Sequence, residues 1–274
     1  MQQVSMLTPS GLATRRIPAP EQPIGMGLIR WGRHEEICTP AYWASQGWML
    51  EMEEPEHYRL GETLAEETLA CLLGGYGIPA EVGLAAYRRL RDVMRADAEA
   101  LKNQFVVERL LRDPLVVNGR PVRYRFAAQK ARYVSTAMVA LEDIDDRIGD
   151  CALRNALVSI PGIGPKTASW IVRNWRGSDE VSILDIHILR AGAILGIFRE
   201  DWRVERHYLL LESAYLEFAR SIGIRASILD SVMWASMREI PAALLKSMLE
   251  KADSAKTRRG NSSKLDVTTQ LTLI

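Results

Sequence analysis

The sequence contains few cysteines, and their placement excludes several classes of protein. Its 274 residues include only three, which lie far apart and form no CxxC pair: Cys38, Cys71 and Cys151. Disulfide-rich domains, zinc sites and iron–sulfur clusters need more cysteines or a closer spacing. We therefore expect no metal site and a reducing compartment.

An excess of charge of one sign is also lacking. Thirty-five basic and 34 acidic residues leave a formal net charge of +1, so composition alone does not indicate a nucleic-acid partner. The charges are nevertheless clustered, with an acidic stretch over 51–67 and basic stretches over 120–132 and 256–264. Each stretch is either solvated surface or, for the basic ones, a face that binds phosphates.

Long apolar runs are missing as well. The first 20 residues lack the apolar core of a secretion signal. The most apolar late stretch, 183–198, contains three charged or titratable residues and is too short to span a bilayer. We expect a soluble cytoplasmic protein that contacts no membrane.

No series of strands and no internal repeat is evident, and helical patterns dominate. Thr63 followed by Glu66 is typical of a helix start, and apolar residues keep a helical period over 204–222. The fold class is therefore predicted to be mainly α. We expect an N-terminal arm and aromatic-rich segment over 1–58, a main domain over 59–250 and a flexible polar tail over 251–274. The first 27 residues of the arm are expected to be extended or disordered.

The most informative segment, 157–168, contains Pro161-Gly162-Ile163-Gly164-Pro165, a tight turn between two predicted helices. Gly162 and Gly164 permit a sharp turn and the close approach of a ligand, and Pro165 suits the first position of a helix. The free N–H groups at this helix start, around Thr167, would face an anion such as a DNA phosphate. A plain glycine turn with a solvated Lys166 is the alternative.

A second run, Ile183-Leu184-Asp185-Ile186-His187, precedes another predicted helix. An aspartate in this position is typical of an N-cap, and we expect Asp185 to cap the helix. His187 is either a structural histidine or a phosphate contact.

Together the two runs resemble the helix-hairpin-helix signature of the HhH-GPD superfamily of DNA glycosylases, and especially its 8-oxoguanine DNA glycosylases. In that signature Pro-Gly-hydrophobic-Gly and one variable residue precede the lysine nucleophile, which is Lys166 here, and an aspartate follows, here Asp185. Upstream, the run 130–135 resembles the helix before the hairpin, which makes Lys130 and Arg132 candidate DNA contacts. The four-cysteine cluster of the endonuclease III branch is missing. The resemblance implies two helical subdomains flanking a DNA-binding cleft.

The resemblance also implies a reaction. Lys166 would attack C1′ of the sugar, expel the base and form a Schiff base, which permits strand cleavage by β-elimination. Asp185 would stabilise the positive charge that develops on the sugar and accept a proton from the nucleophile. The base must first be swung out of the duplex.

Base recognition departs from the eukaryote-like enzymes, which use a glutamine and a phenylalanine. Asp230 and Trp234 stand at those positions, a pattern closer to the archaeal-type 8-oxoguanine glycosylases. Trp234 would stack on the base and Asp230 would accept its N–H groups; a core tryptophan and a capping aspartate are the alternative. Trp170 replaces a pocket cysteine, and Tyr76 is a candidate wedge in a turn that is otherwise ordinary surface.

We therefore expect a monomeric glycosylase with AP lyase activity that excises an oxidised purine, most of all 8-oxoguanine, from double-stranded DNA in a bacterium or archaeon. No organic cofactor is implied, although the family hairpin can hold a monovalent cation through main-chain carbonyls. Three alternatives stay open: a glycosylase for another modified base, including one in foreign DNA, a non-catalytic DNA-binding module, and a helical protein unrelated to DNA.

Overall fold

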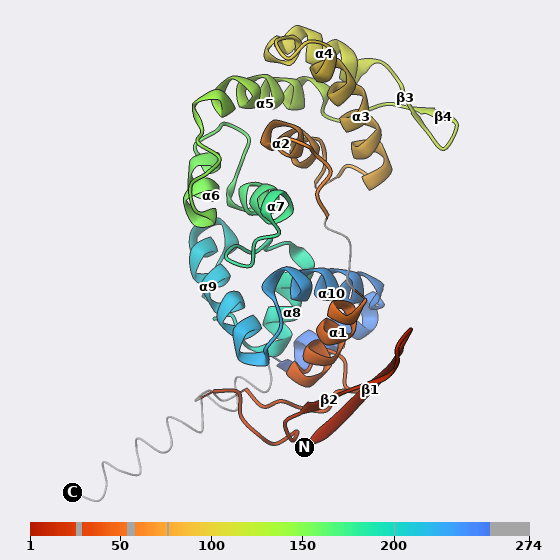
Figure 1. Ribbon diagram of the computed structural model, residues 1–274, viewed down its shortest axis with the longest axis vertical. Coiled ribbons are helices and arrows are strands. Elements are labelled where there is room, and N and C mark those ends of the chain that lie inside the picture. Colours follow the sequence, from red (N-terminus) through yellow and green to blue (C-terminus); the bar gives the residue numbers. More distant parts are fainter. Residues whose placement is uncertain (26–28, 54–57, 76, 200, 253–274) are drawn as a thin grey trace, which may run out of the picture. The chain divides into compact units, whose positions relative to one another are not determined.

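The computed structural model describes residues 1–25, 29–53, 58–75, 77–199 and 201–252 (Figure 1). Helices dominate these residues, which confirms the mainly α fold class. They form two compact units, one from residues 1–55 and 184–274 and the other from residues 56–183. In the described part of the chain, no helix has the length and apolar character that a membrane span requires. Most of the predicted tail, from residue 253 on, lies outside the described residues.

The first unit opens with a hairpin where we expected an extended or disordered arm. Strands β1 (Gln2–Thr8) and β2 (Gly11–Ile17) pair antiparallel along their full length. The hairpin is ordered because Val4 and Ile17 are buried in the core of the unit, so that it is more than an isolated pair of strands. Its helices include α1 (Pro40–Met52), α8 (Ile186–Leu195), α9 (Val204–Ile222) and α10 (Ala226–Glu239), and residues 242–252 are helical as well.

The aromatic-rich segment of the first unit forms α1, which packs against α10 and α9. Thr39 caps its start by accepting a hydrogen bond from the Tyr42 N–H, and Pro40 occupies the first turn. Trp43 is completely buried. The aromatic-rich segment thus contributes to the core of the first unit.

The second unit contains the remaining helices and a short hairpin. Strands β3 (Leu115–Val117) and β4 (Arg120–Val122) pair antiparallel, and two single-turn 3-10 helices flank the long helices. Buried leucines and isoleucines from most of its helices form one core. The helices are α2 (Leu64–Leu73), α3 (Ala80–Ala96), α4 (Gln104–Arg112), α5 (Ala127–Ala140), α6 (Asp150–Val158) and α7 (Pro165–Arg176).

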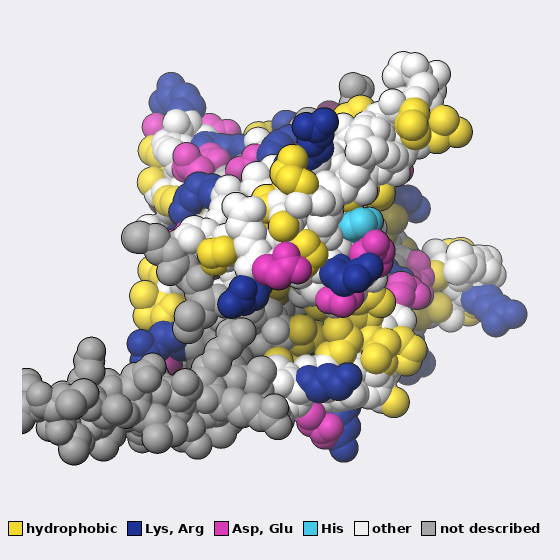
Figure 2. Space-filling view, turned by 90° about the horizontal axis from the view of Figure 1, so that it is seen from below, with side chains coloured by type: hydrophobic (Ala, Val, Ile, Leu, Met, Phe, Trp, Pro, Cys, Tyr) yellow, Lys and Arg dark blue, Asp and Glu magenta, His cyan; other side chains and the backbone are white. Residues whose placement is uncertain are grey.

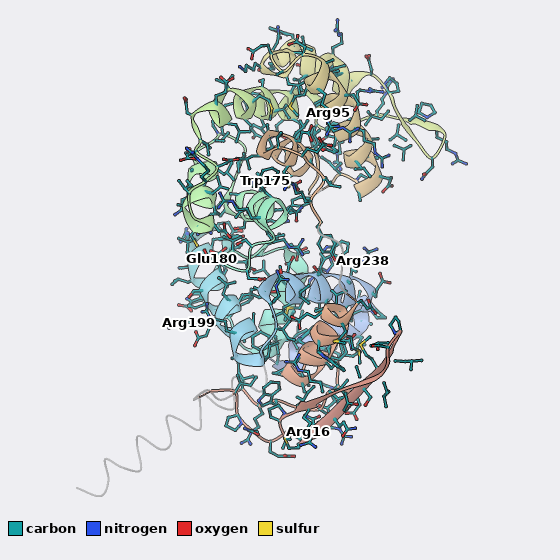
Figure 3. The ribbon with its side chains drawn as sticks, in the orientation of Figure 1. Arg16, Arg95, Trp175, Glu180, Arg199 and Arg238 are labelled. Atoms are coloured by element: carbon teal, nitrogen blue, oxygen red, sulfur yellow. The ribbon has the colours of Figure 1, made fainter. Side chains whose placement is uncertain are left out.

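The start of α2 confirms the predicted cap. The Thr63 hydroxyl accepts a hydrogen bond from the Glu66 N–H at 3.2 Å, and the Glu66 carboxylate accepts one from the Glu62 N–H at 2.7 Å. Arg95 of α3, labelled in Figure 3, donates to both oxygens of Glu66 at 2.6 and 2.9 Å. These contacts fix the first turn of α2 and join it to α3.

Candidate catalytic and nucleic-acid site

The turn between α6 and α7 is anchored in the core of the second unit by apolar side chains. Ile160 and Ile163 are almost fully buried. Gly162 has φ +90°, and a Cβ at this position would collide with the ring of Tyr133 on α5. The first glycine is therefore required by the fold itself, both for its backbone conformation and for its contact with Tyr133.

The second glycine is different, because nothing inside the described structure requires it. Gly164 has φ −84° and ψ 173°, a conformation open to any residue, and a Cβ there would meet no atom within 4 Å. Gly164 is the N-cap of α7, where no side chain caps the helix. The first N–H groups of α7 thus lie beside open space, as an anion-binding helix start requires.

Lys166 is the second residue of α7 and is half-buried. A buried network fixes the other half of this helix. Asn174 donates to Glu67 of α2 at 3.0 Å, and the same carboxylate accepts the Leu60 and Gly61 N–H groups at 2.8 Å. Glu67 is completely buried. The helix that carries Lys166 is therefore pinned to α2, against which it packs (Figure 1).

Asp185 belongs to the first unit and caps α8, as the sequence predicted. Its Oδ1 accepts hydrogen bonds from the His187 and Ile188 N–H groups at 2.8 and 3.0 Å. Both bonds use the same oxygen, so Oδ2 has no partner among the described residues. The side chain is half-buried. One carboxylate can thus cap the helix with one oxygen and present the other to a substrate.

Trp234 of α10 lies next to His187 in this unit. The two rings are 6.5 Å apart at an interplanar angle of 80°, and the guanidinium of Arg238, labelled in Figure 3, lies 4.6 Å from the Trp234 ring centroid. Trp234 is 45% exposed, so the alternative of a core tryptophan is wrong. A half-exposed ring with a polar neighbour and a cation beside it is suited to stacking.

Asp230 precedes Trp234 by one helical turn, so the two side chains share a face of α10. Asp230 is buried and lies inside the helix, whose N-cap is Arg225. His187 is half-buried, and its Nδ1 has no hydrogen-bond partner in the described structure. The first unit thus gathers Asp185, His187 and Trp234 at adjoining positions.

Two of the predicted positions in the second unit have definite structural contacts. The Lys130 ammonium donates to the carbonyls of Leu72 and Gly74 at 2.5 and 3.3 Å, at the end of α2, and burial lowers the pKa of Lys130. Trp170 is half-buried and lies against Gly74, where a Cβ would approach its ring to 3.1 Å.

The remaining positions are less constrained. Arg132 is exposed, and its guanidinium lies 5.4 Å from the centroid of the Tyr133 ring. Thr167 is half-buried next to Lys166. Tyr76, the candidate wedge, lies outside the described residues. The DNA-binding roles of all these residues stay predictions.

Sequence reasoning missed three contributors to the site. Tyr133, which forms the floor under Gly162, lies within the run that resembles the family but received no role. The Glu67–Asn174 bond and the Arg238–Trp234 contact were also missed. For the Glu67–Asn174 bond, the sequence offers one indication, which is a glutamate on an otherwise apolar helix face. Among the described residues, no group of three or more His, Cys, Asp or Glu side chains could hold a metal ion.

The chain is similar to one protein family and to several solved structures. The family model described as 8-oxoguanine DNA glycosylase matches residues 62–224, more than half of the chain. The 8-oxoguanine DNA glycosylase of Thermotoga maritima is 24% identical, with 62% of this chain and 77% of that chain covered and a TM-score of 0.48. The 8-oxoguanine glycosylase/lyase of Methanocaldococcus jannaschii, solved with DNA containing 8-oxoguanine, is also 24% identical; 70% of this chain and 87% of that chain are covered, with a TM-score of 0.49. A search of curated protein sequences found no match.

Proposed function

The chain belongs to the 8-oxoguanine DNA glycosylase family, and on that premise we propose that it excises 8-oxoguanine from duplex DNA through Lys166 and then cleaves the strand. The observation that carries this proposal is the family match over 62–224, because that range includes the hairpin turn, Lys166 and Asp185. A pure DNA-binding module needs the turn but neither of the two reactive side chains.

Lys166 is the nucleophile in this proposal. Its neutral amine forms a bond to C1′ while the bond from C1′ to the base breaks, and the base leaves with the electron pair and acquires a proton. The first amine proton passes to the Asp185 carboxylate. The C1′–O4′ bond then breaks as the nitrogen lone pair forms the C1′=N bond, and O4′ takes up that proton, which leaves a protonated Schiff base between Lys166 and C1′. Removal of a proton from C2′ then expels the 3′ phosphate, which is the lyase step. The pinned position of α7 supports this role, since a nucleophile must be held in place.

Asp185 acts on the sugar. Cleavage of the glycosidic bond develops positive charge at C1′, and a carboxylate nearby stabilises that charge. Its capping bonds through Oδ1 hold the side chain in one rotamer, which leaves Oδ2 to face the sugar or to accept the proton of the attacking amine.

The turn before α7 binds the DNA backbone. The uncapped start of α7 offers main-chain N–H groups to a phosphate oxygen, and the open space at Gly164 lets the backbone of the DNA approach closely. Trp234 stacks on the extruded base, and Asp230 accepts hydrogen bonds from its N–H groups.

The decisive experiment is borohydride trapping with duplexes that differ only in one base: 8-oxoguanine, uracil, an alkylated purine or hydroxymethylcytosine. We expect a covalent adduct with 8-oxoguanine and none with unmodified DNA. An adduct with another base alone would keep the mechanism and replace the substrate. Duplex binding without an adduct on any of these substrates would refute the proposal that the chain excises 8-oxoguanine through a Schiff base.

A further inference from the structure

We propose that the hairpin β3–β4 is a second DNA contact, which binds backbone phosphates of the duplex outside the extruded nucleotide through Arg120 and Arg123. This inference rests on the proposed function only in that the partner is duplex DNA. The hairpin contains no residue that the proposed chemistry uses.

The charge of this segment differs from that of the rest of the chain. Between residues 112 and 132 there are six basic residues and one acidic residue, whereas the whole chain has 35 and 34. On the face of the molecule that Figure 2 presents, positive and negative side chains are instead interspersed. A stretch of one sign in an otherwise balanced protein indicates an anionic partner.

The structure separates the basic residues of this stretch into structural and available ones. Lys130 is directed to main-chain carbonyls at the end of α2, and Arg112 is paired with Glu108 at 2.6 Å. Arg120 and Arg123 are exposed and form no ion pair or side-chain hydrogen bond with any described residue. Their charge is therefore available to a ligand.

The hairpin presents these arginines on a fixed base. Leu115 is buried at its start, and the buried Tyr124 that follows it donates to the Leu73 carbonyl at 2.7 Å. Arg89 of α3 donates to the carbonyls of Leu110, Asp113 and Pro114, which fastens the chain just before β3. Asn118 and Gly119 both have positive φ, as a two-residue hairpin turn requires. A fixed base limits the conformational entropy lost when a ligand binds.

The hairpin base is connected to the α6–α7 turn by direct contacts. A hollow at this base is lined by Arg112, Arg123, Phe126 and Gln129, among others. Gln129 donates to the Tyr133 hydroxyl at 3.2 Å, and the Tyr133 ring is the floor under Gly162.

Four residues of α5 separate Gln129 from Tyr133, which is about 6 Å along a helix. Successive phosphates of one strand are about 3.4 Å apart along the duplex axis. The separation along α5 is therefore less than two such steps, which is short compared with a bound duplex, so that one duplex can contact both the turn and the hollow.

The test is the salt dependence of duplex binding by the full chain, measured by fluorescence anisotropy with undamaged and 8-oxoguanine duplexes over a KCl series. The double variant Arg120→Gln/Arg123→Gln is compared with Arg16→Gln. Arg16 is an exposed arginine on the other hairpin, in β2 (Figure 3), and is the matched control. Arg120→Lys/Arg123→Lys keeps the charge, and thermal melting checks that every variant is folded.

We expect the double glutamine variant to lower the slope of log K against log [KCl] by about 0.9 per lost phosphate contact. Affinity should fall roughly tenfold at low salt for both duplexes. The lysine variant should retain most of the slope, and Arg16→Gln should match wild type. Single-turnover excision at saturating enzyme should not change, because the arginines do not contact the sugar or the base.

An unchanged slope in a folded double variant would refute the hairpin contact while leaving the glycosylase proposal intact. An equal loss in Arg16→Gln would refute it too, since the effect would then follow net charge rather than position. If the wild-type protein excises no base, but the double variant has a lower slope of log K against log [KCl], the proposed function is refuted and the hairpin contact stands.

Discussion

Helices α7 and α8 each have at their start a residue that we assign to the reaction, Lys166 in the first turn of α7 and Asp185 at the N-cap of α8, but the two starts are built differently. The start of α7 has a glycine at the N-cap, a proline next and no side-chain cap, and Lys166 follows. The start of α8 is closed by Asp185, which accepts two of its first N–H groups. The first N–H groups of α7 are open to an external anion. The first N–H groups of α8 are already bonded to Asp185, which fixes the orientation of its carboxylate.

The difference separates binding from orientation. At α7 the main-chain N–H groups themselves bind the phosphate, and Lys166 is placed next to that bound backbone. At α8 the main-chain N–H groups bind no external ligand; they hold the Asp185 carboxylate in one orientation. We expect substitutions at the two starts to have different signatures in binding, excision and stability.

The largest effect is expected from Lys166→Gln, which removes the nucleophile but leaves the open helix start. Single-turnover excision should fall roughly a thousandfold or more, and the borohydride adduct should vanish. Duplex affinity should change little, since the N–H groups of α7 remain. A variant that still forms the adduct would show that another amine is the nucleophile.

Asp185 can be divided into its two tasks by comparing Asp185→Asn with Asp185→Ala. Asparagine is an equally good N-cap, so Asp185→Asn should keep the melting temperature yet lose roughly a hundredfold in excision. Asp185→Ala should lose activity to a similar degree and also about 1 kcal/mol of stability. Full excision by Asp185→Asn would remove the carboxylate from the mechanism.

The two glycines of the turn provide a comparison on the α7 side. Gly162→Ala should cost about 2–3 kcal/mol of folding free energy, because a positive φ and the Tyr133 ring both oppose a Cβ. Gly164→Ala should leave chemical denaturation nearly unchanged and weaken duplex binding severalfold, because its methyl group occupies the space that a phosphate needs. Equal binding by Gly164→Ala and wild type would show that no phosphate approaches there.

The smallest effect concerns α2, a third helix start that is closed by side chains. The Arg95 guanidinium holds the pKa of the Glu66 carboxyl below its ordinary value. A lowered pKa in the folded state contributes stability above the unfolded pKa, and that contribution is lost as the pH falls through the folded pKa. Glu66→Gln should therefore lower the melting temperature at neutral pH and differ less from wild type in acid. A constant difference across that range would exclude the ionised pair as the cause.

Local signals allowed much of this to be predicted from the sequence. A cap depends on a few neighbouring residues, so Thr63 and Asp185 could be recognised without tertiary information. The structural contacts of Lys130 could not be predicted in this way, since the carbonyls that it binds at the end of α2 lie nearly 60 residues earlier in the chain. The N-terminal hairpin was missed for the same reason, because the burial of Val4 and Ile17 depends on a core formed by distant helices.

The discontinuity of the first unit has a consequence for synthesis of the chain. Its two segments, before residue 56 and after residue 183, can join only when both have left the ribosome. The second unit is continuous and can complete its core earlier, because domains generally fold as units during translation. A nascent chain that stalls before residue 184 would thus contain a folded second unit and an incomplete first unit. The β1–β2 hairpin and α1 would then lack α8, α9 and α10, with which they form a core.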